Sequence, residues 1–114
     1  MKRIEAVVPS SSMWQTIGAL EDLNVHFTHY DSRYRGKPEY SPQVEYGRGT
    51  TTMREQFETN VTIVAVVTDS MVDKVVEKIL KSTSLGAQDE GKIFVYEVKD
   101  AIDMRSEAHG DSAI

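Results

Sequence analysis

The stretch that decides the fold is residues 57–80, which read FETNVTIVAVVTDSMVDKVVEKIL. Its first half alternates as a strand does. One side carries Val61, Ile63, Ala65 and Val67, and the other carries Asn60, Thr62, Val64 and Val66. After a predicted cap at Asp69 or Ser70, apolar residues recur at helical spacing, at Val72, Val75, Val76, Ile79 and Leu80. The stretch therefore predicts a strand followed directly by an amphipathic helix.

The residues before this stretch show the same order of elements. Residues 3–8 predict a strand that stops at Pro9, which has no amide hydrogen for pairing. A serine cap at residues 10–12 is expected to open a helix, in which Met13, Ile17 and Leu20 share one face. Asn24 ends that helix, and a second strand is predicted from about residue 25 to residue 34. A fourth strand is predicted over residues 92–98.

Two strand-helix-strand units in one small chain predict an α+β fold, the ferredoxin-like βαββαβ sandwich of four antiparallel strands under two helices. Helices then cover one face of the sheet. The opposite face is also partly apolar, because Val64 and Val66 stack there and residues 93–96 are apolar on both sides. A sheet that is apolar on both faces is usually covered on both. We therefore expect a homo-oligomer whose sheets pack inward.

Composition limits the class of protein. The 114 residues are 39% hydrophobic and 27% charged, which fits one domain over residues 1–114. The chain has no cysteine, which excludes a disulfide framework, a thiolate zinc site and a cysteine nucleophile. The net charge of −5 disfavours nucleic-acid binding. No run of apolar residues reaches membrane-spanning length, so we expect a cytoplasmic protein without membrane insertion.

The segment at residues 35–56 separates the second and third strands and shows no helical or strand period. Loops longer than about 12 to 15 residues are uncommon in compact domains and are usually functional or disordered. Basic residues lie in or near the segment, at Arg33, Arg35, Lys37, Arg48 and Arg54. The segment is predicted to contact an anionic ligand or a partner. A tolerated insertion with solvated charges is the alternative.

The best ligand candidate is the glycine-bounded loop at residues 82–92. Backbone amides in such a turn can bind an anion, and Lys92 adds a positive charge. A plain turn is the alternative, because Asp89 and Glu90 would repel phosphate. His26 and His29 point to opposite faces of a strand and cannot easily share a metal ion. We predict no metal site and no catalytic residue.

Three stretches and the chain ending resemble the PII signal-transduction proteins, the nitrogen regulatory PII family. They are MKRIEAVV at 1–8, GKIFV at 91–95, DAIDMRS at 100–106 and the final Ala113-Ile114. The strongest motif is DEGKIFV at 89–95, which is similar to the family's G-D-G-K-I-F-V. The resemblance spans nearly the whole chain and includes the position of the long loop.

The resemblance implies a non-enzymatic homotrimer that binds ATP or ADP in clefts between subunits, with 2-oxoglutarate and Mg as further ligands. It implies regulation of an ammonium transporter, a nitrogen-metabolism enzyme or a regulator through the long loop, where Tyr46 and Arg48 would contact the partner. The C-terminal segment, residues 100–114, of a neighbouring subunit would close over the nucleotide. The cleft residues carried over are Val7, Thr28, Gly36, Lys37 and Val66. The phosphate-loop residues are Gly86, Asp89, Glu90, Gly91 and Lys92, with Arg105 from across the interface.

The chain departs from the family pattern at several positions. Asp89 stands where the family has glycine, and Asp103 stands where it has a first arginine. Both changes add negative charge near a triphosphate, so AMP is an alternative ligand. Asn60 aligns with the lysine that pairs with 2-oxoglutarate, which leaves 2-oxoglutarate sensing open. The family's uridylylated tyrosine falls near Thr51 or Thr52.

Two other classes of function compete with this reading. A small ferredoxin-like enzyme of acyl-phosphatase type would need an arginine in the loop after the first strand, and residues 9–12 supply none. A sheet that reads RNA would use exposed aromatics such as Phe94 and Tyr96, but it would also need a basic surface.

Overall fold

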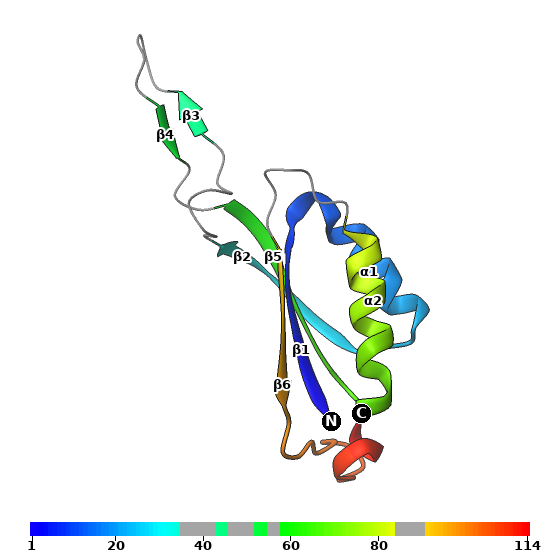
Figure 1. Cartoon of the computed structure of the whole chain (residues 1–114). Coiled ribbons are helices and arrows are strands. Elements are labelled where there is room, and N and C mark those ends of the chain that lie inside the picture. The colour runs from blue at the N-terminus through cyan, green and yellow to red at the C-terminus, as the bar shows by residue number, and fades with distance from the viewer. Residues whose placement is uncertain (35–42, 46–51, 55–57, 84–90) are drawn as a thin grey trace.

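The computed structural model describes residues 1–34, 43–45, 52–54, 58–83 and 91–114. Two helices pack against one face of a four-stranded antiparallel sheet whose strand order is β2-β5-β1-β6 (Figure 1). This arrangement is compatible with the expected ferredoxin-like sandwich. The sheet strands are β1 (Lys2–Pro9), β2 (Phe27–Tyr34), β5 (Glu58–Val67) and β6 (Lys92–Glu97). The helices are α1 (Met13–Asp22) and α2 (Val72–Ser82).

The core lies between the sheet and the helices. On β1 and β5 the buried cross-strand pairs are Ile4 with Ala65, Ala6 with Ile63, and Val8 with Val61. From the helices Ile17, Leu20, Val75 and Ile79 complete this cluster. A partly buried polar contact also joins the helices, because the Ser82 hydroxyl donates to the buried Thr16 hydroxyl at 3.0 Å. The predicted strand face at Val61, Ile63, Ala65 and Val67 is thus confirmed.

The helix α2 forms where the spacing of apolar residues predicted it, but its apolar stripe is not uniformly covered. Val75 and Ile79 are completely buried or nearly so, whereas Leu80 is 60% exposed. Val72 and Val76 lie between these extremes and pack against the core cluster. Leu80 stands at the edge of the stripe, where the sheet no longer covers it.

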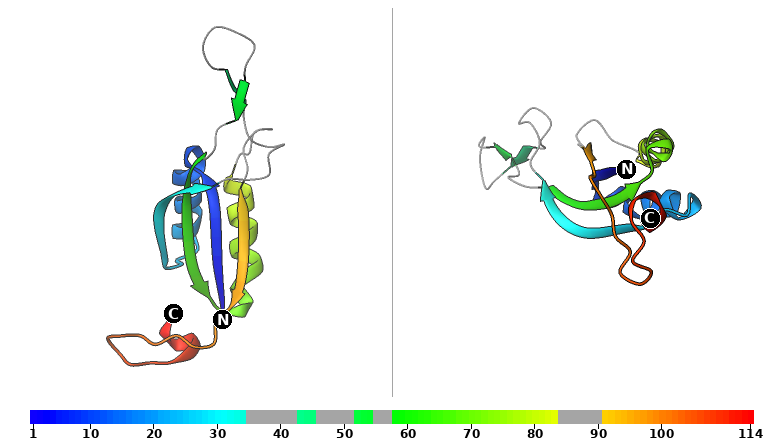
Figure 2. Two further views of the ribbon diagram at one scale, coloured as in Figure 1. Left: turned by 90° about the vertical axis from the view of Figure 1, so that its left-hand side faces the viewer. Right: turned by 90° about the horizontal axis from the view of Figure 1, so that it is seen from below.

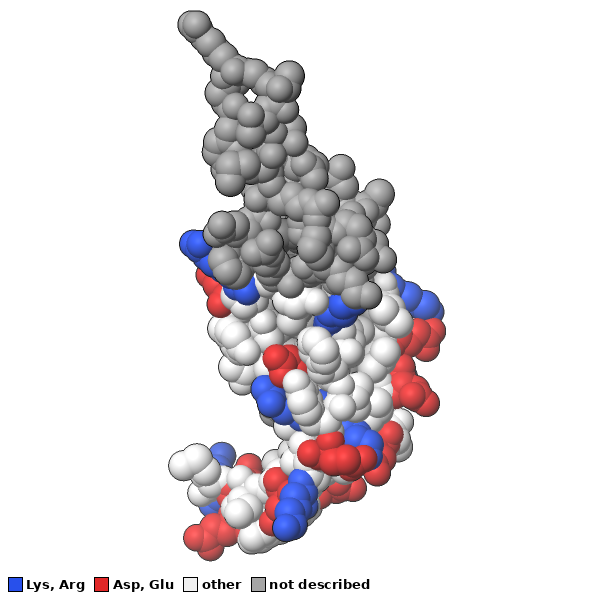
Figure 3. Space-filling model, turned by 60° about the vertical axis from the view of Figure 1, so that its left-hand side comes forward, with Lys and Arg blue, Asp and Glu red and all other residues white. Residues whose placement is uncertain are grey.

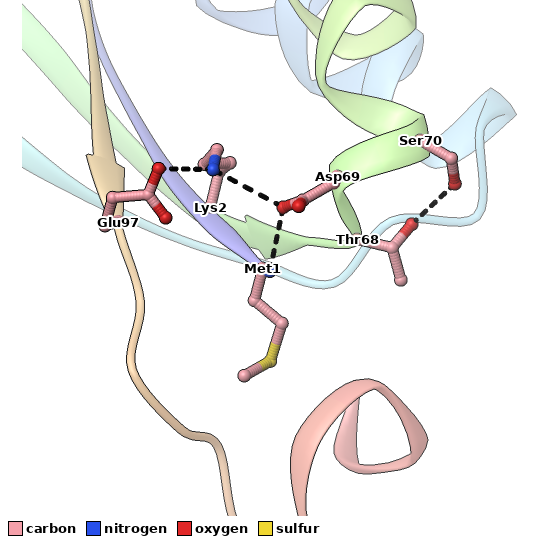
Figure 4. Close-up of polar contacts among 6 residues, drawn as sticks. All are labelled: Met1, Lys2, Thr68, Asp69, Ser70 and Glu97. Carbon is pink, nitrogen blue, oxygen red and sulfur yellow. Dashed lines mark hydrogen bonds and ion pairs between the residues drawn. The ribbon is translucent and has the colours of Figure 1, made fainter.

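The predicted side-chain caps of both helices are wrong. Each helix instead begins after a 3-10 turn, at Ser10–Ser12 before α1 and at Asp69–Met71 before α2, and neither makes a side-chain cap hydrogen bond. Ser12 is buried, and its carbonyl accepts the Thr16 hydroxyl at 3.0 Å. The Asp69 carboxylate is held by the N-terminal ammonium instead (Figure 4). The predicted end of α1 at Asn24 is confirmed, because the helix ends at Asp22 and Asn24 adopts the left-handed conformation with φ 55°.

The long segment contains two short strands that its sequence pattern did not predict. They are β3 (Gln43–Glu45) and β4 (Thr52–Arg54), and they pair antiparallel with Val44 opposite Met53. The expectation that residues 35–56 lack strand structure is therefore wrong for these residues. Strands of three residues are too short to show a period-two pattern.

Figure 2, left, shows the sheet face turned away from the helices, here called the far face. This face carries both apolar and charged groups. Tyr30, Phe94 and Tyr96 are 48%, 43% and 43% exposed, and Val64 and Val66 are half-buried. In the middle, Arg3 pairs with Glu5 at 3.3 Å and lies over the Tyr96 ring at 5.2 Å. Figure 3 shows uncharged atoms over much of the described part of this side, with a few charged groups among them. The expected apolar character of this face is present, and the Arg3–Glu5 ion pair interrupts it.

Candidate ligand-binding hollows

One hollow, of about 310 Å³, lies where β1 ends, β6 begins and α2 ends. We call it the β6 hollow. Antiparallel pairing places Val7 opposite Lys92, so the end of one strand and the start of the other meet there. Three residues that the sequence assigns to the nucleotide cleft, Val7, Gly91 and Lys92, are thereby brought together. The described lining is Val7, Val8, Pro9, Val76, Ile79, Leu80, Thr83, Gly91, Lys92 and Ile93.

The walls of the β6 hollow determine which ligands it can accept. They are mostly aliphatic, and among the described lining residues Lys92 is the one that carries a full charge. Thr83 contributes a hydroxyl, which donates to the carbonyls of Ile79 and Leu80 at 3.2 Å each. The hollow therefore suits a ligand with an apolar body and an anionic end.

A second hollow, of about 390 Å³, lies at the opposite edge of the sheet, over the start of β2 and the end of β5. We call it the β2 hollow. Thr28 pairs directly with Val64, and Val66 follows on the same face. Thr28 and Val66, also assigned to the cleft by the sequence, thus lie together here. The described lining is His26, Phe27, Thr28, Val64, Val66, Asp103, Ala113 and Ile114.

The C-terminal segment reaches the β2 hollow because two aspartates fold it into a closed loop. Asp100 accepts hydrogen bonds from the amides of Ala101 and Gly110, at 2.9 and 3.1 Å, and pairs with the His109 ring at 2.9 Å. The hydrogen bond from His109 lowers the pKa of Asp100, and the two amides act in the same direction. The 3-10 turn Gly110–Ala113 then carries Ile114 to the sheet.

Asp103 organises the turn that follows. One of its carboxylate oxygens, Oδ1, accepts from the Ser106 amide at 2.7 Å, the Arg105 amide at 2.9 Å and the Ser106 hydroxyl at 3.1 Å. These bonds lower the pKa of Asp103, with the Ser106 amide as the largest cause. Asp103 therefore stays ionised while it lines the β2 hollow.

Arg105 follows Asp103 but does not join it in the β2 hollow. It is exposed, and it is absent from the described linings of both hollows. The neighbouring Met104 is 96% exposed. The turn thus directs this part of the segment outward.

The two hollows are separated by the width of the sheet. Thr28 is on edge strand β2 and Lys92 is on edge strand β6, with β5 and β1 between them. Strands lie about 4.8 Å apart, so three spacings separate these residues by roughly 14 Å across the sheet alone. Residues that the family resemblance places in one cleft therefore form two clusters within a protomer.

Several predicted site residues lie outside the described residues. They are Gly36, Lys37, Tyr46, Arg48, Gly86, Asp89 and Glu90. Among the residues that are described, no cluster of three or more His, Asp or Glu side chains could hold a metal ion. A helix both long enough and apolar enough to cross a membrane is likewise missing from this part of the chain.

Sequence reasoning missed part of both linings. His26, Ala113 and Ile114 line the β2 hollow, although the resemblance assigned the C-terminal segment only to the nucleotide cleft of a neighbouring subunit. Leu80 and Thr83 line the β6 hollow. The exposed position of Leu80 at the edge of its stripe is a sign that sequence spacing alone does not give.

Comparison with known proteins gives consistent matches over the whole length. A family model described as nitrogen regulatory protein P-II matches residues 1–108. The nitrogen regulatory protein P-II of Haemophilus influenzae is 31% identical over 114 residues, which is all of both chains. That of Rhodospirillum rubrum is 29% identical over 115 residues, and nitrogen regulatory protein P-II 1 of Escherichia coli is 29% identical over 114 residues, again with full coverage of each chain.

Proposed function

Since this chain belongs to the nitrogen regulatory protein P-II family, we propose that it is a nitrogen-regulation signalling protein that senses an adenine nucleotide between subunits. Proteins of this family act in signalling rather than as enzymes, and they bind nucleotides. The proposed ligand is ATP or ADP, and the proposed site of action is the cytoplasm.

The observation that carries this proposal is the division of the cleft residues between two hollows at opposite edges of one sheet. Neither hollow holds the full set. A head-to-tail ring of identical copies would set the β6 hollow of one copy against the β2 hollow of the next, because heterologous contacts that close form rings. We propose a ring of three copies, whose far faces meet around its axis.

The charges and shapes of the two hollows give each a role in such a seam. Lys92 would bind phosphate from the β6 side, while Thr28 and Val66 would close the cleft from the β2 side. Arg105, directed outward from its own copy, would contact the ligand across the seam. A ligand held by two copies stabilises their assembly by mass action.

Residues 35–56 are proposed to transmit nucleotide binding to a partner by direct contact. The partner would be an ammonium transporter, a nitrogen-metabolism enzyme or a regulator. Tyr46 and Arg48 are the proposed contact residues. To move such a segment from 1:99 to 99:1 between two states, ligand binding must favour one state by about 5.5 kcal/mol. Asn60 stands where the family has the lysine that pairs with 2-oxoglutarate, so binding of 2-oxoglutarate with Mg is a separate question. It is tested by a second titration.

A mixing experiment tests the shared site. Lys92→Glu reverses the charge in the β6 hollow, and Thr28→Trp fills the β2 hollow with a large side chain. Neither variant alone is therefore expected to bind ATP or ADP in calorimetry. Rings reassembled from equal amounts of both are expected to bind at about one quarter of the seams, since a random ring joins two intact hollows that often. No recovery on mixing would contradict a shared site, and no binding of AMP, ADP or ATP by the wild-type chain would contradict nucleotide sensing itself.

A further inference from the structure

The β2 hollow has a distinctive charge. Asp103 supplies the one side-chain carboxylate of its described lining, and no lysine or arginine is found among those residues. The remaining described groups are aliphatic or aromatic side chains, the Thr28 hydroxyl and the His26 ring. A ligand that enters this hollow therefore meets a fixed negative charge.

This charge cannot easily move away, because Asp103 is tied to its own turn. Three hydrogen bonds converge on Oδ1, at 2.7, 2.9 and 3.1 Å, and its amide also donates to the Ala108 carbonyl at 2.9 Å. Rotation of the carboxylate away from the ligand would break all three bonds to Oδ1. Their donors also lower the pKa of Asp103, so protonation near neutral pH offers no relief.

We propose that Asp103 is a specificity-determining residue, which makes the seam bind a nucleoside monophosphate more tightly than the corresponding triphosphate. The inference rests on the proposed function, because it concerns the nucleotide held between the two hollows. Each added phosphate brings negative charge toward a carboxylate that stays ionised. Repulsion between charges closer than the Debye length, about 8 Å at physiological salt, is only partly screened. A monophosphate satisfies Lys92 without placing further charge against Asp103.

The test is calorimetry of the full-length protein with AMP, ADP and ATP, for the wild-type chain and for Asp103→Asn. Asparagine keeps an oxygen that can accept the turn's hydrogen bonds but removes the charge. The wild-type chain is expected to bind AMP most tightly. In Asp103→Asn the affinity for ATP is expected to rise about 3- to 10-fold relative to that for AMP.

Two matched variants separate charge from loosening of the turn. Asp111→Asn removes one charge from the same segment at a residue outside the described lining, and Ser106→Ala removes one donor to Asp103 while the charge stays. Both are expected to keep the wild-type ratio of ATP to AMP affinity. Ala113→Lys offsets the charge within the lining and leaves the turn intact, so it tests the inference even if Asp103→Asn does not fold. It is expected to favour ATP.

The outcomes distinguish this inference from the proposed function. A ratio that shifts toward ATP in Asp103→Asn or Ala113→Lys, but not in the two controls, supports the role of Asp103. Binding of nucleotides with an unchanged ratio in both variants, or a wild-type preference for ATP, overturns this inference and leaves nucleotide sensing standing. Absence of any nucleotide binding by the wild-type chain overturns both.

Discussion

Asp69 shows how much a single side chain can connect. Its carboxylate accepts a hydrogen bond from the N-terminal ammonium at 2.8 Å and lies 3.6 Å from the Lys2 ammonium. The Lys2 ammonium also donates a hydrogen bond to Glu97 (Figure 4). The start of β1, the entry to α2 and the end of β6 are thereby joined. The hydrogen bond from the N-terminal ammonium is the largest cause that lowers the pKa of Asp69.

This shift sets the direction of a pH effect. Because the folded-state pKa lies below the ordinary value of 3.8, the ion pair contributes stability above that value and loses it as pH falls through the folded pKa. Asp69→Asn is therefore expected to lower the urea midpoint at pH 7, and the difference from the wild-type chain is expected to shrink below about pH 4. Asp73→Asn, in the first turn of the same helix, is the control. A difference that stays constant down to pH 2 would contradict this account.

Asn60 is the opposite case, a buried polar group that is poorly satisfied. It is completely buried, its Nδ2 reaches the Val8 carbonyl only at 3.4 Å, and its Oδ1 has no hydrogen-bond partner among the described residues. An unsatisfied buried acceptor costs about 1–3 kcal/mol. Asn60→Val is thus expected to leave the free energy of unfolding unchanged or higher, and Asn60→Asp to lower it. Urea unfolding measures both, and a strong loss in Asn60→Val would show that the amide is better satisfied than its geometry indicates.

At the scale of elements, α2 provides a matched pair of neighbours. Ile79 is 2% exposed and Leu80 is 60% exposed, although both fall on the helical stripe that the sequence predicts. Ile79→Ala is expected to cost about 2–5 kcal/mol of unfolding free energy, because it opens a cavity in the core. Leu80→Ala is expected to cost less than about 1 kcal/mol. Equal losses would mean that Leu80 is covered by another part of the protein.

The elements also show where prediction from sequence succeeds. The strand β5 and the helix α2 were predictable because their periods persist over ten and eleven residues. The strands β3 and β4 were not, because three residues hold no period. The prediction of a helix cap at Asp69 was wrong because a tertiary contact holds this side chain. Its carboxylate binds the N-terminal ammonium, which lies 68 positions earlier in the sequence.

The candidate site was predictable in its members but not in its arrangement. The local sequence does not indicate that the four described cleft residues divide between two hollows. They are Val7 and Lys92 in one, and Thr28 and Val66 in the other. That division follows from the strand order, which places β2 and β6 at opposite edges. The contribution of Ile114 depends on how Asp100 and Asp103 fold the last residues, which no periodicity encodes.

At the scale of the whole molecule, the far face tests the proposed ring. Phe94 and Val95 are adjacent on β6 and similarly exposed, at 43% and 49%, but they point to opposite faces of the sheet. Phe94→Glu would place a second carboxylate beside Glu5, its cross-strand partner. This variant is expected to sediment as a folded monomer, whereas the wild-type chain and Val95→Glu sediment as trimers. A wild-type chain that stays monomeric at micromolar concentration would contradict the ring.

The placement of the two hollows has a consequence for cells that make both normal and defective copies of this protein. In the proposed ring each subunit contributes to two neighbouring sites, one through each edge of its sheet. A copy damaged at one edge would silence a single site, but a copy damaged at both would silence two of the three, leaving one between its healthy neighbours. In cells that make equal amounts of both copies, a defect at one edge should therefore silence about half of the sites, and a defect at both edges about three quarters.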